Sequence, residues 1–93
     1  MQLARALALA CFATPGLAQD APPGAVACTG CHGLFPEAPF PIQQLSADEI
    51  AAALAGYRDG TREGTLMPRI AKGFSDEQSR AIAEWFAAEG GSQ

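Results

Sequence analysis

The sequence predicts a small all-α domain, and three observations support that fold class. Two serines are each followed three residues later by Glu or Gln, a pattern that opens helices. Apolar residues then recur at helical spacing after both serines. No βαβ pattern and no internal repeat appears along the 93 residues. One helical domain is therefore expected.

The first 18 residues have the character of an export leader. A short basic start over residues 1–5 precedes an uncharged apolar run over residues 6–13, and Gly16-Leu17-Ala18 offers the small-x-small pattern that signal peptidase cleaves. The apolar run is far shorter than the roughly 20 residues of a membrane-spanning helix. We therefore expect a signal peptide over 1–18, cleaved after Ala18, and a periplasmic domain over 19–93 with no stable membrane anchor.

Cleavage would also set the composition of the mature chain. It removes Arg5 and Cys11, leaving Cys28 and Cys31 as the cysteines, and five basic residues against ten acidic ones, a net charge of −5. Nucleic acid and anionic membranes are poor partners for such a chain. A domain of about 75 residues barely buries enough apolar surface to offset chain entropy, so a cofactor, metal or covalent staple is expected.

Two helices are predicted in the first half of the domain. A short one fits Ala25 to His32, and the prolines of Gly33 to Gln44 make that following segment a loop. Ser46 and Glu49 then form a capping box with Leu45 and Ile50 placed as a hydrophobic staple. The second helix is predicted from about Ala47 to Arg58.

The second half is predicted to hold one irregular segment and one helix. Gly60 to Gly73 contains three glycines and Pro68 without a sustained period, which indicates irregular structure. Ser75 and Gln78 form the second capping box. The helix after it carries one apolar stripe, made of Ile82, Trp85 and Phe86. Gly90 and Gly91 are predicted to stop it.

The chemistry of the chain is concentrated in Cys28-Thr29-Gly30-Cys31-His32, a c-type haem attachment motif. On a helical turn, positions i, i+3 and i+4 share one face, so both sulfurs and the imidazole can address one flat ring. The thiols would add to the haem vinyl groups, and His32 would be the proximal iron ligand. One covalently bound haem c is therefore predicted.

Three simpler interpretations of the cysteine pair predict further features. Zinc needs four ligands, but the mature chain offers only Cys28, Cys31 and His32. A thioredoxin-type redox pair calls for a βαβ pattern, which is absent. A disulfide is physically possible, yet an i,i+3 bridge closes a tiny loop and constrains the unfolded chain little. Haem attachment is the favoured interpretation.

The ligand on the opposite face of the haem is Met67, Lys72 or nothing, because His32 is the only histidine. Methionine usually fills a core, but Met67 belongs to no apolar stripe, and Pro68 is expected to keep it out of the α region. Met67 is therefore predicted as the distal iron ligand, which would raise the reduction potential and close the site to oxygen.

Other residues carry weaker signals. Core or haem packing is the expected role of four aromatic residues, Tyr57, Phe74, Trp85 and Phe86. Arg69 and Lys72 flank the ligand and are either contacts for haem propionates or a partner, or ordinary surface charge. A carbonyl of Pro39 or Pro41 is the expected acceptor for the His32 Nδ1 hydrogen bond.

The motif at residues 28–33, the run TLMPRIAKGFSDEQ at residues 65–78 and the closing AIAEWFA resemble class I c-type cytochromes. The stretch over residues 67–77 is similar to the cytochrome subunits of flavocytochrome c sulfide dehydrogenases. The resemblance implies three to four short helices around one haem, with Cys28, Cys31, His32 and Met67 as its attachment points and ligands. The proline-rich loop and the short first helix depart from the family pattern.

We therefore expect an electron-transfer protein rather than an enzyme. The resemblance implies that it passes single electrons in the periplasm, as the haem subunit beside an FAD-containing sulfide dehydrogenase subunit. One alternative is a free cytochrome carrier that delivers electrons to a terminal oxidase. A less favoured alternative is a haem enzyme or gas sensor with an open sixth site, which would bind carbon monoxide.

Overall fold

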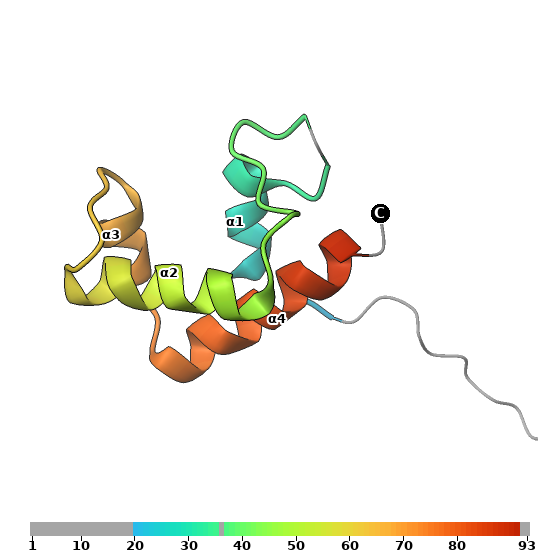
Figure 1. The fold of residues 1–93 in the computed structure, drawn as a ribbon. Helices are drawn as coiled ribbons and strands as arrows, with labels where there is room; N and C mark the ends of the chain where they lie inside the picture. The colour runs from blue at the N-terminus through green and yellow to red at the C-terminus, as the bar shows by residue number, and fades with distance from the viewer. Residues whose placement is uncertain (1–19, 36, 92–93) are drawn as a thin grey trace, which may run out of the picture.

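The computed structural model describes residues 20–35 and 37–91, and within these ranges it contains four helices and no strand (Figure 1). The helices are α1 (Ala25–His32), α2 (Ala47–Asp59), α3 (Met67–Ala71) and α4 (Asp76–Gly91). The all-α prediction is thus confirmed. The predicted signal peptide over 1–18 lies outside the described residues and stays a prediction.

Three helices begin and end close to where the sequence predicted. α1 has the expected bounds, and α2 extends one residue further, to Asp59. Both capping boxes form, because the Ser46 side chain accepts from Glu49 N–H at 3.0 Å and the Ser75 side chain accepts from Gln78 N–H at 3.1 Å. α4 continues through the two glycines that were expected to stop it and ends at Gly91.

The segment over 60–73 differs from the prediction. It was expected to be irregular throughout, but residues 67–71 form α3. Met67 opens this helix, so the expectation that Pro68 keeps Met67 out of the α region was wrong. Proline is tolerated in the first helical turn, because the N–H that it lacks has no partner there.

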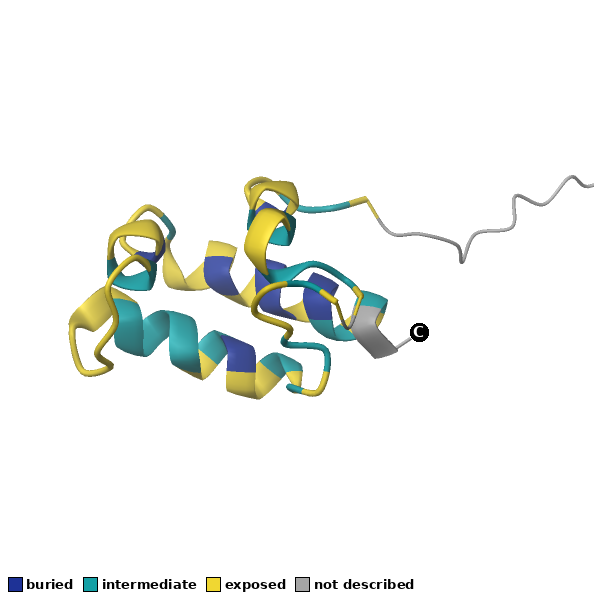
Figure 2. Ribbon diagram, turned by 90° about the horizontal axis from the view of Figure 1, so that it is seen from above, coloured by how far each residue is buried: buried dark blue, intermediate teal, exposed yellow. Residues whose placement is uncertain are grey.

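The core lies between α2 and α4, which run in opposite directions, with α1 packed on α4 and α3 packed on α2 (Figures 1 and 2). Its buried side chains are Ala25, Ile50, Ile82, Ala83, Trp85 and Phe86. The rings of Trp85 and Phe86 meet edge to face with centroids 5.1 Å apart. The core role predicted for these two aromatics is confirmed, and Phe74 packs against the core cluster. Tyr57 is half-buried outside this cluster.

Ion pairs and one close glycine contact also join the helices. Exposed ion pairs join Arg58 to Asp76 at 2.7 Å and Arg80 to Asp48 at 2.8 Å, both between α2 and α4. Such pairs contribute about 0–1 kcal/mol each. At the start of α1, Gly24 has a φ of 91°, and a Cβ there would lie 2.5 Å from Phe74 Cε1. Glycine therefore lets the short α1 approach the beginning of α4.

Candidate haem site

The first half of the site is the last turn of α1. Cys28, Cys31 and His32 lie at positions i, i+3 and i+4 of this helix, as predicted. Cys31 is exposed, whereas Cys28 and His32 are half-buried, and neither thiol forms a disulfide. Burial raises the pKa of the Cys28 thiol. Both sulfurs and the imidazole are thus presented on one helical face.

The backbone of Phe40 holds His32 in place. His32 Nδ1 lies 2.7 Å from the Phe40 carbonyl oxygen, and the Phe40 N–H donates to the Cys31 carbonyl at 2.9 Å. A carbonyl only accepts, so Nδ1 carries the proton in this contact and Nε2 keeps its lone pair for a metal. The imidazole is therefore oriented as a metal ligand is.

The prediction that a carbonyl of Pro39 or Pro41 accepts the His32 hydrogen bond is wrong, because the Phe40 carbonyl occupies that place. Proline has no N–H, so among residues 39–41 only Phe40 can donate to the Cys31 carbonyl. That pairing brings the Phe40 carbonyl beside His32. Pro41 also biases Phe40 toward an extended backbone. The Pro-Phe-Pro pattern therefore indicates the acceptor, but the acceptor is the carbonyl of Phe40 and not that of either proline.

The predicted distal ligand, Met67, lies at the beginning of α3. Met67 is half-buried there, and α3 stands on the same side of the α2 and α4 pair as α1 (Figures 1 and 2). α3 packs against α2, whereas α1 packs against α4. His32 and Met67 therefore lie on helices that pack against different neighbours, α4 and α2 respectively.

Large apolar side chains are exposed on α1, on the loop that follows it and at α3. Among the described residues these are Val26, Phe35, Phe40, Leu66 and Ile70. Four of the five are at least 57% exposed, and no large side chain in this part of the chain is fully buried. Apolar side chains thus remain exposed on the same segments that carry the two thiols, the imidazole and the thioether. That combination fits haem, whose flat ring is largely apolar.

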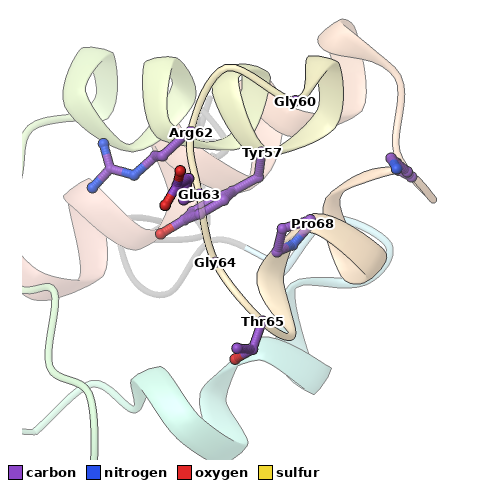
Figure 3. Close-up of a pocket in the computed structure, with 8 residues that line it drawn as sticks. Tyr57, Gly60, Arg62, Glu63, Gly64, Thr65 and Pro68 are labelled. Atoms are coloured by element: carbon purple, nitrogen blue, oxygen red, sulfur yellow. The ribbon is translucent and has the colours of Figure 1, made fainter.

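A pocket of about 500 Å³ lies beside α3 (Figure 3). Its lining comes from the end of α2, the following loop and α3, and comprises Tyr57, Gly60, Arg62, Glu63, Gly64, Thr65, Pro68 and Lys72. Lys72 lines this pocket and Met67 does not. Sequence reasoning missed Arg62, whose Cζ lies 5.2 Å from the Tyr57 ring centroid. Tyr57 and Arg62 are five residues apart, a spacing that does not make two side chains neighbours on a helix, so the sequence did not predict their contact.

In the part of the chain that the structure describes, no group of three or more His, Cys, Asp or Glu side chains is arranged to hold a metal ion. No helix in the same ranges is both long and apolar enough to cross a membrane.

Comparisons with known proteins identify relatives but no matching family model. The chain is 36% identical over 64 residues to the cytochrome subunit of sulfide dehydrogenase from Chlorobaculum tepidum, covering 66% of this chain and 58% of that protein. It is 40% identical over 72 residues to a thiosulfate dehydrogenase electron acceptor from Stutzerimonas stutzeri, covering 73% of this chain and 33% of that protein. The chain thus spans less than two thirds of both proteins.

A third relative is matched over most of its length. Cytochrome c-554(548) from Halomonas halodenitrificans is 33% identical over 69 residues, which cover 67% of this chain and 83% of that protein. Proteins of this kind carry covalently bound haem c, and Cys28, Cys31 and His32 supply the corresponding CxxCH segment here. With an all-helical fold and this haem-binding segment, the chain belongs to the class I c-type cytochromes, a family of electron-carrying haem proteins.

Proposed function

We propose that the protein carries single electrons through one haem c with four protein attachments. Cys28 and Cys31 form the thioether bonds, His32 is the proximal iron ligand and Met67 is the distal one. The observation that carries the proposal is the 2.7 Å contact between His32 Nδ1 and the Phe40 carbonyl, on the same turn as both thiols. It leaves Nε2 as the free imidazole nitrogen.

His32 and Phe40 set the proximal side. The hydrogen bond to the Phe40 carbonyl fixes the plane of the imidazole and makes Nε2 a more basic ligand. Thioether bonds at Cys28 and Cys31 would attach the same turn of α1 to the haem. The proximal ligand therefore needs little rearrangement when the charge on the iron changes.

Met67 sets the distal side. When bound, haem supplies an iron that takes up and releases one electron at a time. A thioether at the sixth position raises the reduction potential and excludes oxygen. Since α3 begins at Met67 and continues with Pro68, the ligand is attached to a stiff turn rather than to a flexible loop. These residues favour electron transfer over substrate chemistry.

The partner that we propose is a dehydrogenase of an inorganic sulfur compound, with an FAD-containing subunit that reduces the haem in the periplasm. The relatives that support it are a cytochrome subunit of sulfide dehydrogenase and an electron acceptor of thiosulfate dehydrogenase. The proposal includes export directed by the predicted leader over residues 1–18, with cleavage after Ala18. The excess of acidic residues favours a basic docking surface on the partner.

A free carrier is the second candidate, and the match to 83% of cytochrome c-554(548) favours it. Purification from the native cell separates the two. A stable complex with a flavin-containing chain supports the subunit role, whereas a lone small haem protein refutes it and supports the diffusing carrier.

Haem attachment itself is tested on a denaturing gel stained for haem, with the wild type and the double variant Cys28→Ala/Cys31→Ala made in a strain that attaches haem. The wild-type band should stain at the mass of the chain, and the variant band should not. An unstained wild-type band would refute the proposal. The single variants then show whether each thiol holds one bond.

A further inference from the structure

The loop between α2 and α3, residues 60–66, folds back onto the last turn of α2. Gly60 has a φ of 88°, and its N–H donates to the Gly56 carbonyl at 3.0 Å. The N–H of Arg62 donates to the same carbonyl at 3.1 Å. A Cβ at Gly56 would lie 3.0 Å from Arg62 Cβ, so the absence of a side chain there lets the loop return closely.

Tyr57 is the side chain on which the returning loop rests (Figure 3). The Arg62 guanidinium carbon lies 5.2 Å from its ring centroid, within the range of a cation–π contact. A Cβ at Gly64 would lie 2.9 Å from Tyr57 Cε1 and 3.2 Å from Pro68 Cδ. Gly64 therefore passes between the tyrosine and proline rings with no room for a methyl group. We call these four residues, Tyr57, Arg62, Gly64 and Pro68, the Tyr57 cluster.

The Tyr57 cluster ends at the residue that follows Met67. α3 has only five residues, too few to be stable as an isolated helix. It rests on α2, and its Ala71 is fully buried. The place where α3 begins is therefore set by its packing against α2 and by the Tyr57 cluster, rather than by helix propensity.

We propose that Tyr57 is a positioning residue for the distal ligand: through Gly64 and Pro68 it holds Met67 where its sulfur binds the haem iron. This proposal rests on the proposed function, because it takes Met67 as the ligand. Arg62 contributes by holding the tyrosine ring from the loop side. Loosening or overfilling the cluster would displace α3 and raise the fraction of protein whose sixth position is open.

The test uses the full holoprotein with Gly64→Ala and Tyr57→Leu. Two signals report on Met67: the sulfur-to-iron charge-transfer band of the ferric protein, and the affinity of the ferrous protein for carbon monoxide. Each variant should weaken the band and increase the carbon monoxide affinity at least about tenfold, which is a change of about 1.4 kcal/mol. Tyr57→Phe should retain the wild-type values, because the contacts of Tyr57 with Gly64 and Arg62 involve its ring atoms.

Two controls separate positioning from general destabilisation. Arg58→Gln removes a neighbouring exposed ion pair of α2 and should leave both signals unchanged. The double variant Gly64→Ala/Tyr57→Leu removes the ring atoms that the new methyl would meet, so its effect should be smaller than the sum of the single effects. Simple additivity, or equal effects of Arg58→Gln, would overturn the positioning role.

Met67→Ala, measured in parallel, distinguishes failure of this proposal from failure of the proposed function. If Met67→Ala changes neither signal, the distal ligand is misassigned and the proposed function fails at that point. If Met67→Ala abolishes the band while Gly64→Ala and Tyr57→Leu leave both signals at wild-type values, the ligand stands and the positioning role of Tyr57 is refuted.

Discussion

The two sides of the proposed haem site are held by different kinds of contact. On the proximal side, His32 is fixed by Phe40, eight residues further along the chain, and the thiols lie on the same helical turn. On the distal side, Met67 lies on a five-residue helix that depends on α2 and on the loop over residues 60–66. One ligand is positioned by local sequence and the other by tertiary packing.

This difference predicts where the site is vulnerable. The covalent bonds to Cys28 and Cys31 would keep His32 close to the iron even when the rest of the chain loosens. Nothing covalent ties Met67, so its bond should be lost first when the packing of α3 on α2 weakens. The distal side should therefore respond to substitutions where α2 and the loop over residues 60–66 contact α3, and the proximal side to changes in a few backbone contacts.

The largest effect is expected from Met67→Ala. Loss of the thioether should open the sixth position, so that the ferrous protein binds carbon monoxide far more tightly than the wild type does. The reduction potential should fall by roughly 100 mV or more, within the range of about 0.8 V that axial ligands span. Spectroscopic titration with carbon monoxide and a potentiometric titration measure both. Unchanged values would show that the distal side holds no methionine ligand.

A smaller effect is expected from Phe40→Pro on the proximal side. This substitution removes the N–H that bonds the Cys31 carbonyl and should destabilise the protein by about 1 kcal/mol relative to Phe40→Ala. Phe40→Ala is the matched control, since it removes the ring and keeps both backbone groups. Urea unfolding of the two variants measures the difference. Equal stabilities would mean that this backbone contact does not hold the proximal loop.

The two capping serines sharpen the comparison, because α2 supports α3 whereas α4 supports α1. Ser46→Ala and Ser75→Ala should each reduce the free energy of unfolding by about 1 kcal/mol. Ser46 lies at the end of α2 that is far from α3 (Figure 1), so Ser46→Ala should leave the sulfur charge-transfer band unchanged until the whole protein unfolds. Weakening of the band by Ser46→Ala in the folded protein would contradict support of Met67 by the C-terminal end of α2.

The smallest effect is expected in the pH dependence of stability, through Asp59 at the end of α2. Hydrogen bonds from the Thr61 hydroxyl and then the Thr61 N–H, with the charge of Arg58, lower the pKa of Asp59 below its ordinary value of 3.8. A lowered folded-state pKa means that the stabilisation is present above about pH 3.8 and is lost as the pH falls through the folded-state pKa. The stability difference between wild type and Asp59→Ala should therefore shrink in acid. A difference independent of pH would contradict this.

The local features of the fold were predictable from the sequence, and the features set by packing were not. Ser46 and Ser75 predicted where α2 and α4 begin, because a capping box needs only two residues that are three positions apart in the chain. α3 was missed, because five residues with a proline carry no period and form a helix only against α2. The haem attachment motif identified His32 as the proximal ligand. The carbonyl that accepts its hydrogen bond could not be predicted, because it depends on which backbone N–H pairs with the Cys31 carbonyl. The contact between Tyr57 and Gly64 likewise had no sequence signal.

The most direct test of the central claim, that His32 and Met67 bind the iron from opposite faces, is proton magnetic resonance of the reduced protein. Met67 is the only methionine after the predicted leader, so its methyl group is unambiguous in the mature protein. If Met67 is bound, the haem ring current shifts that methyl resonance far upfield of the ordinary methionine position, and the Met67→Ala variant lacks the signal. A methyl resonance at the ordinary position in the wild type would contradict the account.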